Sequence, residues 1–184
     1  MRTDTDIVVG VTGSAAAFKA VSLVSRLTKE GKRVEVVLTP AALKFVGCAS
    51  FEGLTGRPVL SDFFTHQEQP IHVRLAGRAR CLLIAPATAA TVCKIAYGIA
   101  DNLLVATALC FHTKPRLIAP AMEEQMFSGG PVQRAIRLLE SDGWRIIGPV
   151  EGRLASGKIG KGRLAEPDMI VKEVLSSLEG EAEA

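Results

Sequence analysis

The stretch Ile7-Val8-Val9-Gly10-Val11-Thr12-Gly13-Ser14, followed by a helix-forming segment from about Ala15, decides the fold of this chain. Its apolar part is typical of a buried strand, and the strand ends in a Gly-Ser turn that leads into a helix N-terminus. At such a turn, free backbone N–H groups and the positive end of the helix dipole point the same way. The turn is therefore either an anion site for a phosphate-bearing cofactor or an ordinary strand–helix connection.

The turn differs from a dinucleotide-binding fingerprint. It lacks the GxGxxG spacing, and the second apolar run, Val34–Thr39, does not end in an acidic residue that could bind a ribose. Hydroxyl-bearing, small or proline residues follow four of the predicted strands: Gly13-Ser14, Thr39-Pro40, Pro86-Ala87-Thr88 and Pro120-Ala121-Met122. Small residues admit a flat ring and hydroxyls bind phosphate, so the pattern favours a mononucleotide-like cofactor.

Strands and helices alternate along the chain. The predicted strands are Ile7–Thr12, Val34–Thr39, Cys81–Ala85, Arg116–Ala119 and Trp144–Ile147. The predicted helices are Ala15–Glu30, Pro40–Phe45, Thr88–Ala96, Pro131–Asp142 and a last one from Pro167. This order predicts an α/β fold with a parallel sheet covered on both faces, in a single domain over residues 1–178 with a disordered acidic tail at 179–184.

Composition narrows the class of protein. The chain has 184 residues, of which 48% are hydrophobic, and this suits one domain with a sizeable core. The net charge of +3 is slight and scattered, so a nucleic-acid partner is not expected. We expect no membrane span and no secretory leader. The four cysteines have neither CxxC spacing nor nearby histidines, which favours a reducing, cytoplasmic location and no metal site.

Roughly residues 6 to 172 resemble a known family. The matching stretches are Val11–Ala16, Ala85–Thr91, Gly98–Leu104, Ala119–Met122 and Gly160–Glu166. They resemble the FMN-dependent cysteine decarboxylases, with the phosphopantothenoylcysteine decarboxylases nearest and the lanthipeptide cysteine decarboxylases more distant. The resemblance implies a Rossmann-like, flavodoxin-type three-layer subunit, a homotrimer or a higher assembly of trimers, and FMN at the subunit interface.

The resemblance also implies site residues. It assigns cofactor binding to Gly13, Ser14, Thr39, Pro86, Thr88, Thr91 and Ala121. At Ala90 the family commonly has Asn, and this change removes one polar side chain while the backbone of the turn remains.

The stretch Pro70–Leu75 matches the family block that carries the catalytic base, so the role falls to His72. In the family this histidine helps to oxidise the cysteine Cα–S unit while the flavin takes up the hydride equivalent. The resulting thioaldehyde-like species loses CO₂, because the carbanion is delocalised onto sulfur as an enethiolate. A histidine suits this step because its pKa lies near working pH. His66 and His112 match no block and are expected to be structural.

The first departure from the family lies in its Pro-x-Met-Asn-x-x-Met motif, which the resemblance assigns to substrate binding together with Arg163. Here the motif contains Met122 and has Glu123 in place of the asparagine. Two carboxylates in contact would repel each other by about 4 kcal/mol at an effective dielectric constant of 20. Glu123 is therefore protonated, or faces a cation, or meets a substrate group other than a carboxylate.

The second departure lies in a glycine-rich flap, where the family's proton-donating cysteine is replaced by Ser156. A hydroxyl is a far weaker acid than a thiol, whose pKa is about 8.5, so the final reduction of the enethiol is expected to be slow or absent. Three hypotheses remain open. The chain decarboxylates a cysteine-ended substrate such as 4′-phosphopantothenoylcysteine in coenzyme A biosynthesis, or it decarboxylates a peptidyl or other cysteine oxidatively and releases the enethiol, or it is a catalytically silent FMN-binding regulatory subunit.

Overall fold

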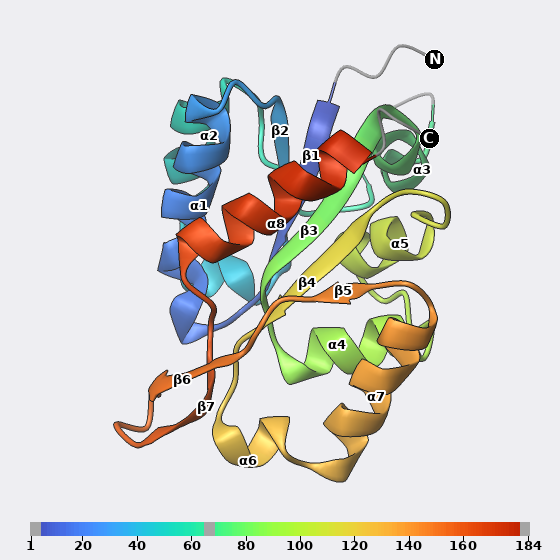
Figure 1. Cartoon of the computed structure of the whole chain (residues 1–184). Coiled ribbons are helices and arrows are strands. Elements are labelled where there is room, and N and C mark those ends of the chain that lie inside the picture. Colours follow the sequence, from blue (N-terminus) through green and yellow to red (C-terminus); the bar gives the residue numbers. More distant parts are fainter. Residues whose placement is uncertain (1–4, 65–68, 181–184) are drawn as a thin grey trace.

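The computed structural model describes residues 5–64 and 69–180. At its centre is a parallel five-stranded sheet with the order β2-β1-β3-β4-β5 (Figure 1). Its strands are β1 (Thr5–Val11), β2 (Val34–Leu38), β3 (Ala79–Ala87), β4 (Arg116–Pro120) and β5 (Arg145–Ile146). The residues of β1 and β2 are buried almost throughout, as expected of parallel strands with helices on both faces.

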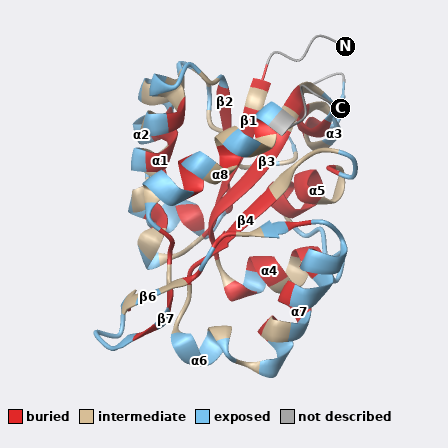
Figure 2. Cartoon of the chain, viewed as in Figure 1, coloured by how far each residue is buried: buried red, intermediate tan, exposed pale blue. Residues whose placement is uncertain are grey.

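Two helical layers enclose the sheet. The helices are α1 (Phe18–Lys29), α2 (Cys48–Thr55), α3 (Ile71–Arg78), α4 (Ala89–Ala96), α5 (Leu103–Leu109), α6 (Glu124–Phe127), α7 (Gly130–Ser141) and α8 (Pro167–Gly180). Short 3₁₀ turns η1 (Ala15–Ala17) and η2 (Ala42–Lys44) precede α1 and α2. The apolar faces of α1, α2 and α8 form one buried core with the sheet, and α3, α4, α5 and α7 form the other (Figure 2).

This three-layer architecture confirms the predicted α/β, Rossmann-like fold. All five predicted strands are present, with small differences at their ends. The helix predicted over Pro40–Phe45 is present only as the short 3₁₀ helix η2. Helix α8 extends through Gly180, two residues beyond the predicted end of the domain at residue 178. Residues 181–184 lie outside the described part, as does His66.

Helices α2, α5 and α6 and the form of the flap were not predicted from the sequence. The flap is an antiparallel hairpin of β6 (Val150–Arg153) and β7 (Ile159–Arg163), which stands apart from the main sheet (Figure 1). Glycines stand where the apolar residues of a typical strand would be. Exposed residues alternate with partly buried ones in β6 and with buried glycines in β7.

The topology fixes where a ligand can bind. After β1 the chain builds β2 on one side of it and then crosses to build β3 on the other. In open parallel sheets, ligands bind outside the carboxyl ends of the strands where the order reverses, which here is between β1 and β3.

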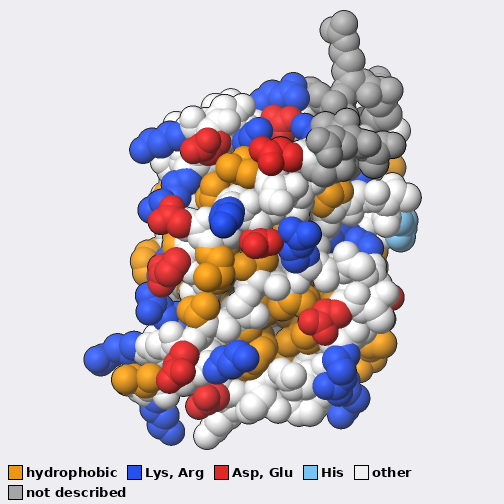
Figure 3. All heavy atoms as spheres, viewed as in Figure 1, with side chains coloured by type: hydrophobic (Ala, Val, Ile, Leu, Met, Phe, Trp, Pro, Cys, Tyr) orange, Lys and Arg blue, Asp and Glu red, His pale blue; other side chains and the backbone are white. Residues whose placement is uncertain are grey.

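The face shown in Figure 3 carries no large patch of a single charge. On the face shown in Figure 3, acidic and basic side chains are interspersed among hydrophobic ones. Within the described part of the chain, no helix combines the length and apolar character needed to cross a bilayer.

Candidate functional site

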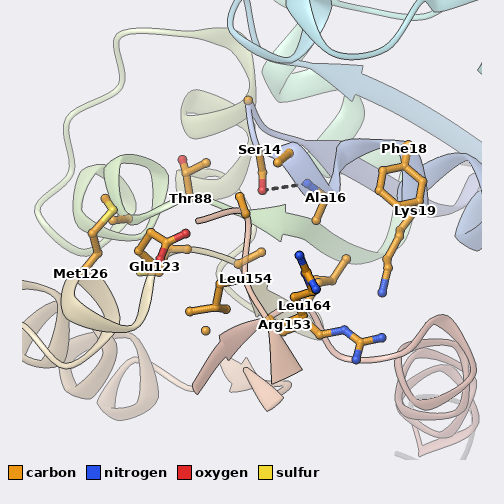
Figure 4. A pocket seen from close by; sticks show the side chains of 18 residues that line it. Ser14, Ala16, Phe18, Lys19, Thr88, Glu123, Met126, Arg153, Leu154 and Leu164 are labelled. Carbon is orange, nitrogen blue, oxygen red and sulfur yellow. Dashed lines mark hydrogen bonds between the residues drawn. The ribbon is translucent and has the colours of Figure 1, made fainter. Parts of the chain in front are cut away.

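A cavity of about 710 Å³ lies at the carboxyl ends of β1, β3 and β4 and is bordered by the β6–β7 hairpin (Figure 4). Its lining comes from these strand ends, from η1 and α1, from α6 and from the hairpin: Gly13, Ser14, Ala15, Ala16, Phe18, Lys19, Thr88, Ala89, Ala121, Met122, Glu123, Met126, Arg153, Leu154, Ala155, Gly162, Arg163 and Leu164. Its volume lies within the range typical of cofactor and small-molecule sites.

A buried hydroxyl joins the ends of β1 and β3 at the floor of the site. Thr12 is 1% exposed, and its Oγ1 donates to the Pro86 carbonyl at 2.7 Å. The same oxygen accepts from the Thr88 amide at 3.0 Å. Both bonds are formed inside the protein, so the two turns that follow these strands are held in one fixed relation.

The turn after β1 has the properties of an anion site. Ser14 caps η1, its Oγ accepting from the Ala16 amide at 3.2 Å, and its own hydroxyl proton remains available to a ligand (Figure 4). Within the described residues, the amides of Gly13 and Ala15 donate no hydrogen bond to the protein. A Cβ on Gly13 would lie 2.5 Å from the Cβ of Ala41, so only glycine fits this close approach.

The other predicted cofactor residues act mainly as caps. Thr88 caps α4, its side chain accepting from the Thr91 amide, and the two hydroxyls lie 3.3 Å apart. Thr39 is buried and its Oγ1 accepts from the Ala42 amide at 3.2 Å. Thr88 lines the cavity, whereas Thr39, Thr91 and Pro86 support the turns around it.

One end of the cavity is basic. Lys19, Arg153 and Arg163 all line it (Figure 4). The Nζ of Lys19 is buried, lies 3.5 Å from Oε2 of Glu166 and forms no hydrogen bond within the described structure. Glu166 also forms an ion pair with Arg163. The carboxylate therefore offsets part of this positive charge and holds two cationic side chains beside the cavity.

The other end carries Glu123, and here the structure joins the two departures from the family. Oε1 of Glu123 accepts from the Ser156 amide at 3.1 Å, and Oε2 accepts from the Ser156 hydroxyl at 2.8 Å. The Glu123 carboxylate is thus bound by two donors from the hairpin and not by a cation. The contact between Glu123 and Ser156 was not predicted from the sequence.

The hairpin is also docked along β7. The Met122 amide donates to the Gly162 carbonyl at 2.9 Å, and the Lys161 amide donates to Oε1 of Glu124 at 3.1 Å. A Cβ on Gly162 would lie 2.1 Å from the Met122 carbonyl oxygen, so the two backbones meet more closely than any side chain would allow.

His72 does not line this cavity within one chain. It lies in the first turn of α3, half-buried, with its ring edge-on to Phe63 at a centroid distance of 5.9 Å. Its Nδ1 is buried and has no hydrogen-bond partner in the described structure.

The structure therefore brings seven of the twelve predicted site residues into the cavity wall: Gly13, Ser14, Thr88, Ala121, Met122, Glu123 and Arg163. Ser156 borders it through Glu123. Lys19 and Arg153 also line the cavity and were not predicted from the sequence. The position of Lys19, one turn of helix beyond the Gly-Ser turn, could have indicated it, whereas no local pattern distinguishes Arg153 from other hairpin cations. Among residues 5–64 and 69–180, no three His, Cys, Asp or Glu side chains are grouped so as to hold a metal ion.

The chain is similar to known proteins over most of its length. The "Coenzyme A biosynthesis bifunctional protein CoaBC" of Bacillus subtilis is 40% identical over 174 residues, which cover 94% of this chain and 43% of the relative. The "Probable phosphopantothenoylcysteine decarboxylase" of Streptococcus mutans is 36% identical over 175 residues and is covered over 98% of its length. The chain thus spans about two fifths of the length of the bifunctional relatives that it matches.

Two solved structures are similar over nearly the whole chain. A Cys-to-Ser mutant of a "PPC decarboxylase", complexed with pantothenoylaminoethenethiol, superimposes with a TM-score of 0.86 at 32% identity, covering 95% of this chain and 98% of that one. The FMN-dependent cysteine decarboxylase SpaF gives a TM-score of 0.84 at 30% identity, covering 98% of each. The profile of the family described as "Flavoprotein" matches residues 1–179, and the chain therefore belongs to the Flavoprotein family.

Proposed function

We propose that this protein is an FMN-dependent decarboxylase of a cysteine-ended small molecule such as 4′-phosphopantothenoylcysteine, acting in coenzyme A biosynthesis. The observation that carries the proposal is the cavity at the carboxyl ends of β1 and β3, with its anion-binding turn, in a chain 36% identical over nearly its full length to a protein bearing that enzyme's name. Relatives named for this pathway favour it over the peptidyl-cysteine and silent-subunit alternatives.

The residues present fit FMN. Two unbonded amides, the Ser14 hydroxyl proton and a helix N-terminus converge beside Gly13, and this arrangement suits a phosphate. Ala121 and Ala89 leave the adjoining wall without bulky side chains, which suits a flat ring. When bound, FMN would supply a two-electron acceptor for oxidation of the cysteine unit.

The role proposed for His72 requires a second copy of the chain. Because His72 lies outside the cavity of its own subunit, it would act as the base only if it entered a neighbouring subunit's cavity, as in a homotrimer with FMN at the interface. Mixing two inactive variants, His72→Ala and Gly13→Ala, under conditions that allow subunit exchange should restore part of the activity. Mixtures that stay inactive, or a monomeric molar mass in solution, would contradict this arrangement.

We expect the negatively charged groups of the substrate to bind at the basic end of the cavity. Lys19, Arg153 and Arg163 would attract the carboxylate or phosphate of the substrate, whereas Glu123 would repel either group. We further propose that the protein acts in the cytoplasm, where a coenzyme A precursor would be available.

The test is incubation of the FMN-loaded protein with 4′-phosphopantothenoylcysteine, followed by mass spectrometry of the products. Loss of CO₂ with the thiol as product is the expected result. Absence of any mass change, with this and other cysteine-ended compounds, would contradict decarboxylation and favour a silent flavin-binding subunit.

One observation favours a second candidate, in which the reaction ends at the enethiol. The Ser156 hydroxyl already donates to Glu123, so its proton is engaged within the protein. The solved Cys-to-Ser mutant is complexed with a compound named as an ethenethiol. A product two hydrogens lighter than the thiol, formed in amounts equal to the flavin, would support this candidate.

A further inference from the structure

The β6–β7 hairpin cannot depend on its own pairing for its position over the cavity. It is a two-stranded ribbon that pairs with no strand of the main sheet, and an isolated ribbon of this kind is only marginally stable in water. Its docking on the rest of the subunit must therefore fix it.

The hydrogen bonds between the hairpin and the segment 122–124 fall into two groups. Along β7, the Met122 amide donates to the Gly162 carbonyl, and the Lys161 amide donates to the Glu124 carboxylate. At the tip, residues 154–158 are mostly exposed, and the hydrogen bonds from there to α6 and its cap are the two that Ser156 donates to Glu123. The tip is also the part that contributes Leu154 and Ala155 to the cavity wall.

We infer that Glu123 and Ser156 form a latch, a bidentate contact that closes the hairpin tip over the cavity and makes both of them positioning residues. The carboxylate accepts from the amide and the hydroxyl of one residue, and hydrogen bonds to a charged group are stronger than those between neutral groups. The hydroxyl proton points to Glu123, so Ser156 holds the tip in place and does not protonate the substrate.

The latch explains why both departures occur in one chain. A serine at this position gives Glu123 a donor, and the glutamate gives the serine an ionised acceptor, so each change supplies the partner of the other. Opening of the latch would expose the wall formed by Leu154 and Ala155 and admit a substrate. This role in the reaction rests on the proposed function, whereas the latch itself is testable without flavin or substrate.

Hydrogen-exchange mass spectrometry of the full chain, on peptides that cover residues 154–158, tests the latch directly. Glu123→Ala removes both acceptors and should speed exchange in these peptides about tenfold, since a hydrogen bond to a charged group contributes roughly the free energy of a tenfold change. Ser156→Ala keeps the amide donor and should give a smaller increase, about threefold. The double variant should match Glu123→Ala alone, because the two side chains form one contact.

Two variants serve as controls. Ser156→Thr retains the hydroxyl and should restore the exchange rate of the wild-type protein. Lys158→Ala changes an exposed tip side chain outside the latch and should leave the rate unchanged. Slow exchange in β1 and β3 would show that each variant is folded. If Glu123→Ala does not fold, Glu123→Gln, which retains one acceptor, takes its place.

Wild-type exchange in Glu123→Ala, or increases that add in the double variant, would overturn the latch. Neither result would bear on decarboxylation, and an inactive protein with the expected exchange pattern would leave the latch standing while refuting the proposed function.

Discussion

The strand-end turns and the hairpin surround the same cavity but are held by different kinds of contact. At the strand ends, the buried Thr12 hydroxyl bonds to two backbone groups, and Gly13 approaches Ala41 too closely for any other residue. At the hairpin tip, two partly or fully exposed side chains bond to each other. The side of the cavity proposed to bind the cofactor is therefore fixed by the fold, whereas residues on the proposed substrate side can change without disturbing the fold.

Ser156→Cys should have the largest effect, which is on the rate of product formation, and it tests the role of the hairpin. A thiol is a much stronger acid than a hydroxyl, and general acid catalysis contributes about 10²- to 10⁴-fold, so formation of the thiol product should speed by about 10²-fold. Single-turnover kinetics with product analysis would measure it. Ser156→Ala is the matched control and should not speed the step, and an unchanged rate in the Cys variant would refute the assignment of this position.

Gly13→Ala tests the opposite side. The added methyl would lie 2.5 Å from the Ala41 Cβ and 3.0 Å from its carbonyl carbon, so the turn must move. We expect a loss of about 1–3 kcal/mol in stability, typical of overpacking, together with a lower flavin content. Denaturation and flavin absorbance measure these quantities. Gly47→Ala is the control for a general effect of replacing glycine, because an added Cβ there meets nothing within 4 Å and its φ is −89°. Full flavin binding by Gly13→Ala would contradict a fixed turn.

Thr12→Val should destabilise the protein by about 1–3 kcal/mol, because the Pro86 carbonyl and the Thr88 amide would lose a buried partner. Ser156→Ala removes an exposed hydroxyl and should lower the free energy of unfolding by only about 0.6 kcal/mol, the equivalent of the threefold faster exchange expected at the hairpin tip. Urea denaturation of the two variants compares the regions directly. Equal losses would remove the distinction between them.

The smallest effect on stability is expected from replacing Asp6, which lies at the amino end of β1, whereas the cavity lies at the carboxyl end. Burial alone would raise the pKa of its carboxyl, but the hydrogen bonds and charge of Arg33, with the charge of Arg80, outweigh burial and lower the pKa below 3.8. Its contribution is therefore present above the unfolded-state pKa and is lost as pH falls through the folded-state value, below about pH 4.

Asp6→Asn should accordingly cost about 0.5–1 kcal/mol at pH 7, and the difference from the wild-type protein should shrink below about pH 4. Thermal denaturation over a pH series measures it. A difference in stability that grows at acid pH would show that the pKa of Asp6 is raised in the folded protein and not lowered. Flavin binding should stay unchanged throughout.

Much of the fold could be predicted because its signals are local. The apolar runs of β1 and β2 and the Gly31 that follows the first helix are visible in the sequence, and Gly31 has the positive φ of 73° expected after a helix end. Helix α5 was missed because six of its seven residues are buried, so it shows no amphipathic pattern. The hairpin was not recognised as a hairpin because Gly160 and Gly162 are selected by close contact with residues 122–124, which are more than 30 residues away in sequence.

The site was predictable where it follows strand ends and not where it depends on pairing between distant side chains. Gly13, Ser14 and Thr88 follow predicted strands and line the cavity. The bond between Glu123 and Ser156 spans 33 residues, so it becomes visible only when the hairpin is folded back on α6. The position of His72 relative to the cavity depends on a neighbouring subunit, and its role stays a prediction.

The most direct test compares the affinities of the wild-type protein for FMN and for riboflavin, measured by flavin fluorescence titration. If the turn at Gly13 and Ser14 binds the phosphate through charge-assisted hydrogen bonds, FMN should bind on the order of 100-fold more tightly than riboflavin. Gly13→Ala should remove most of that difference. Equal affinity for the two flavins, or no binding of either, would contradict the account.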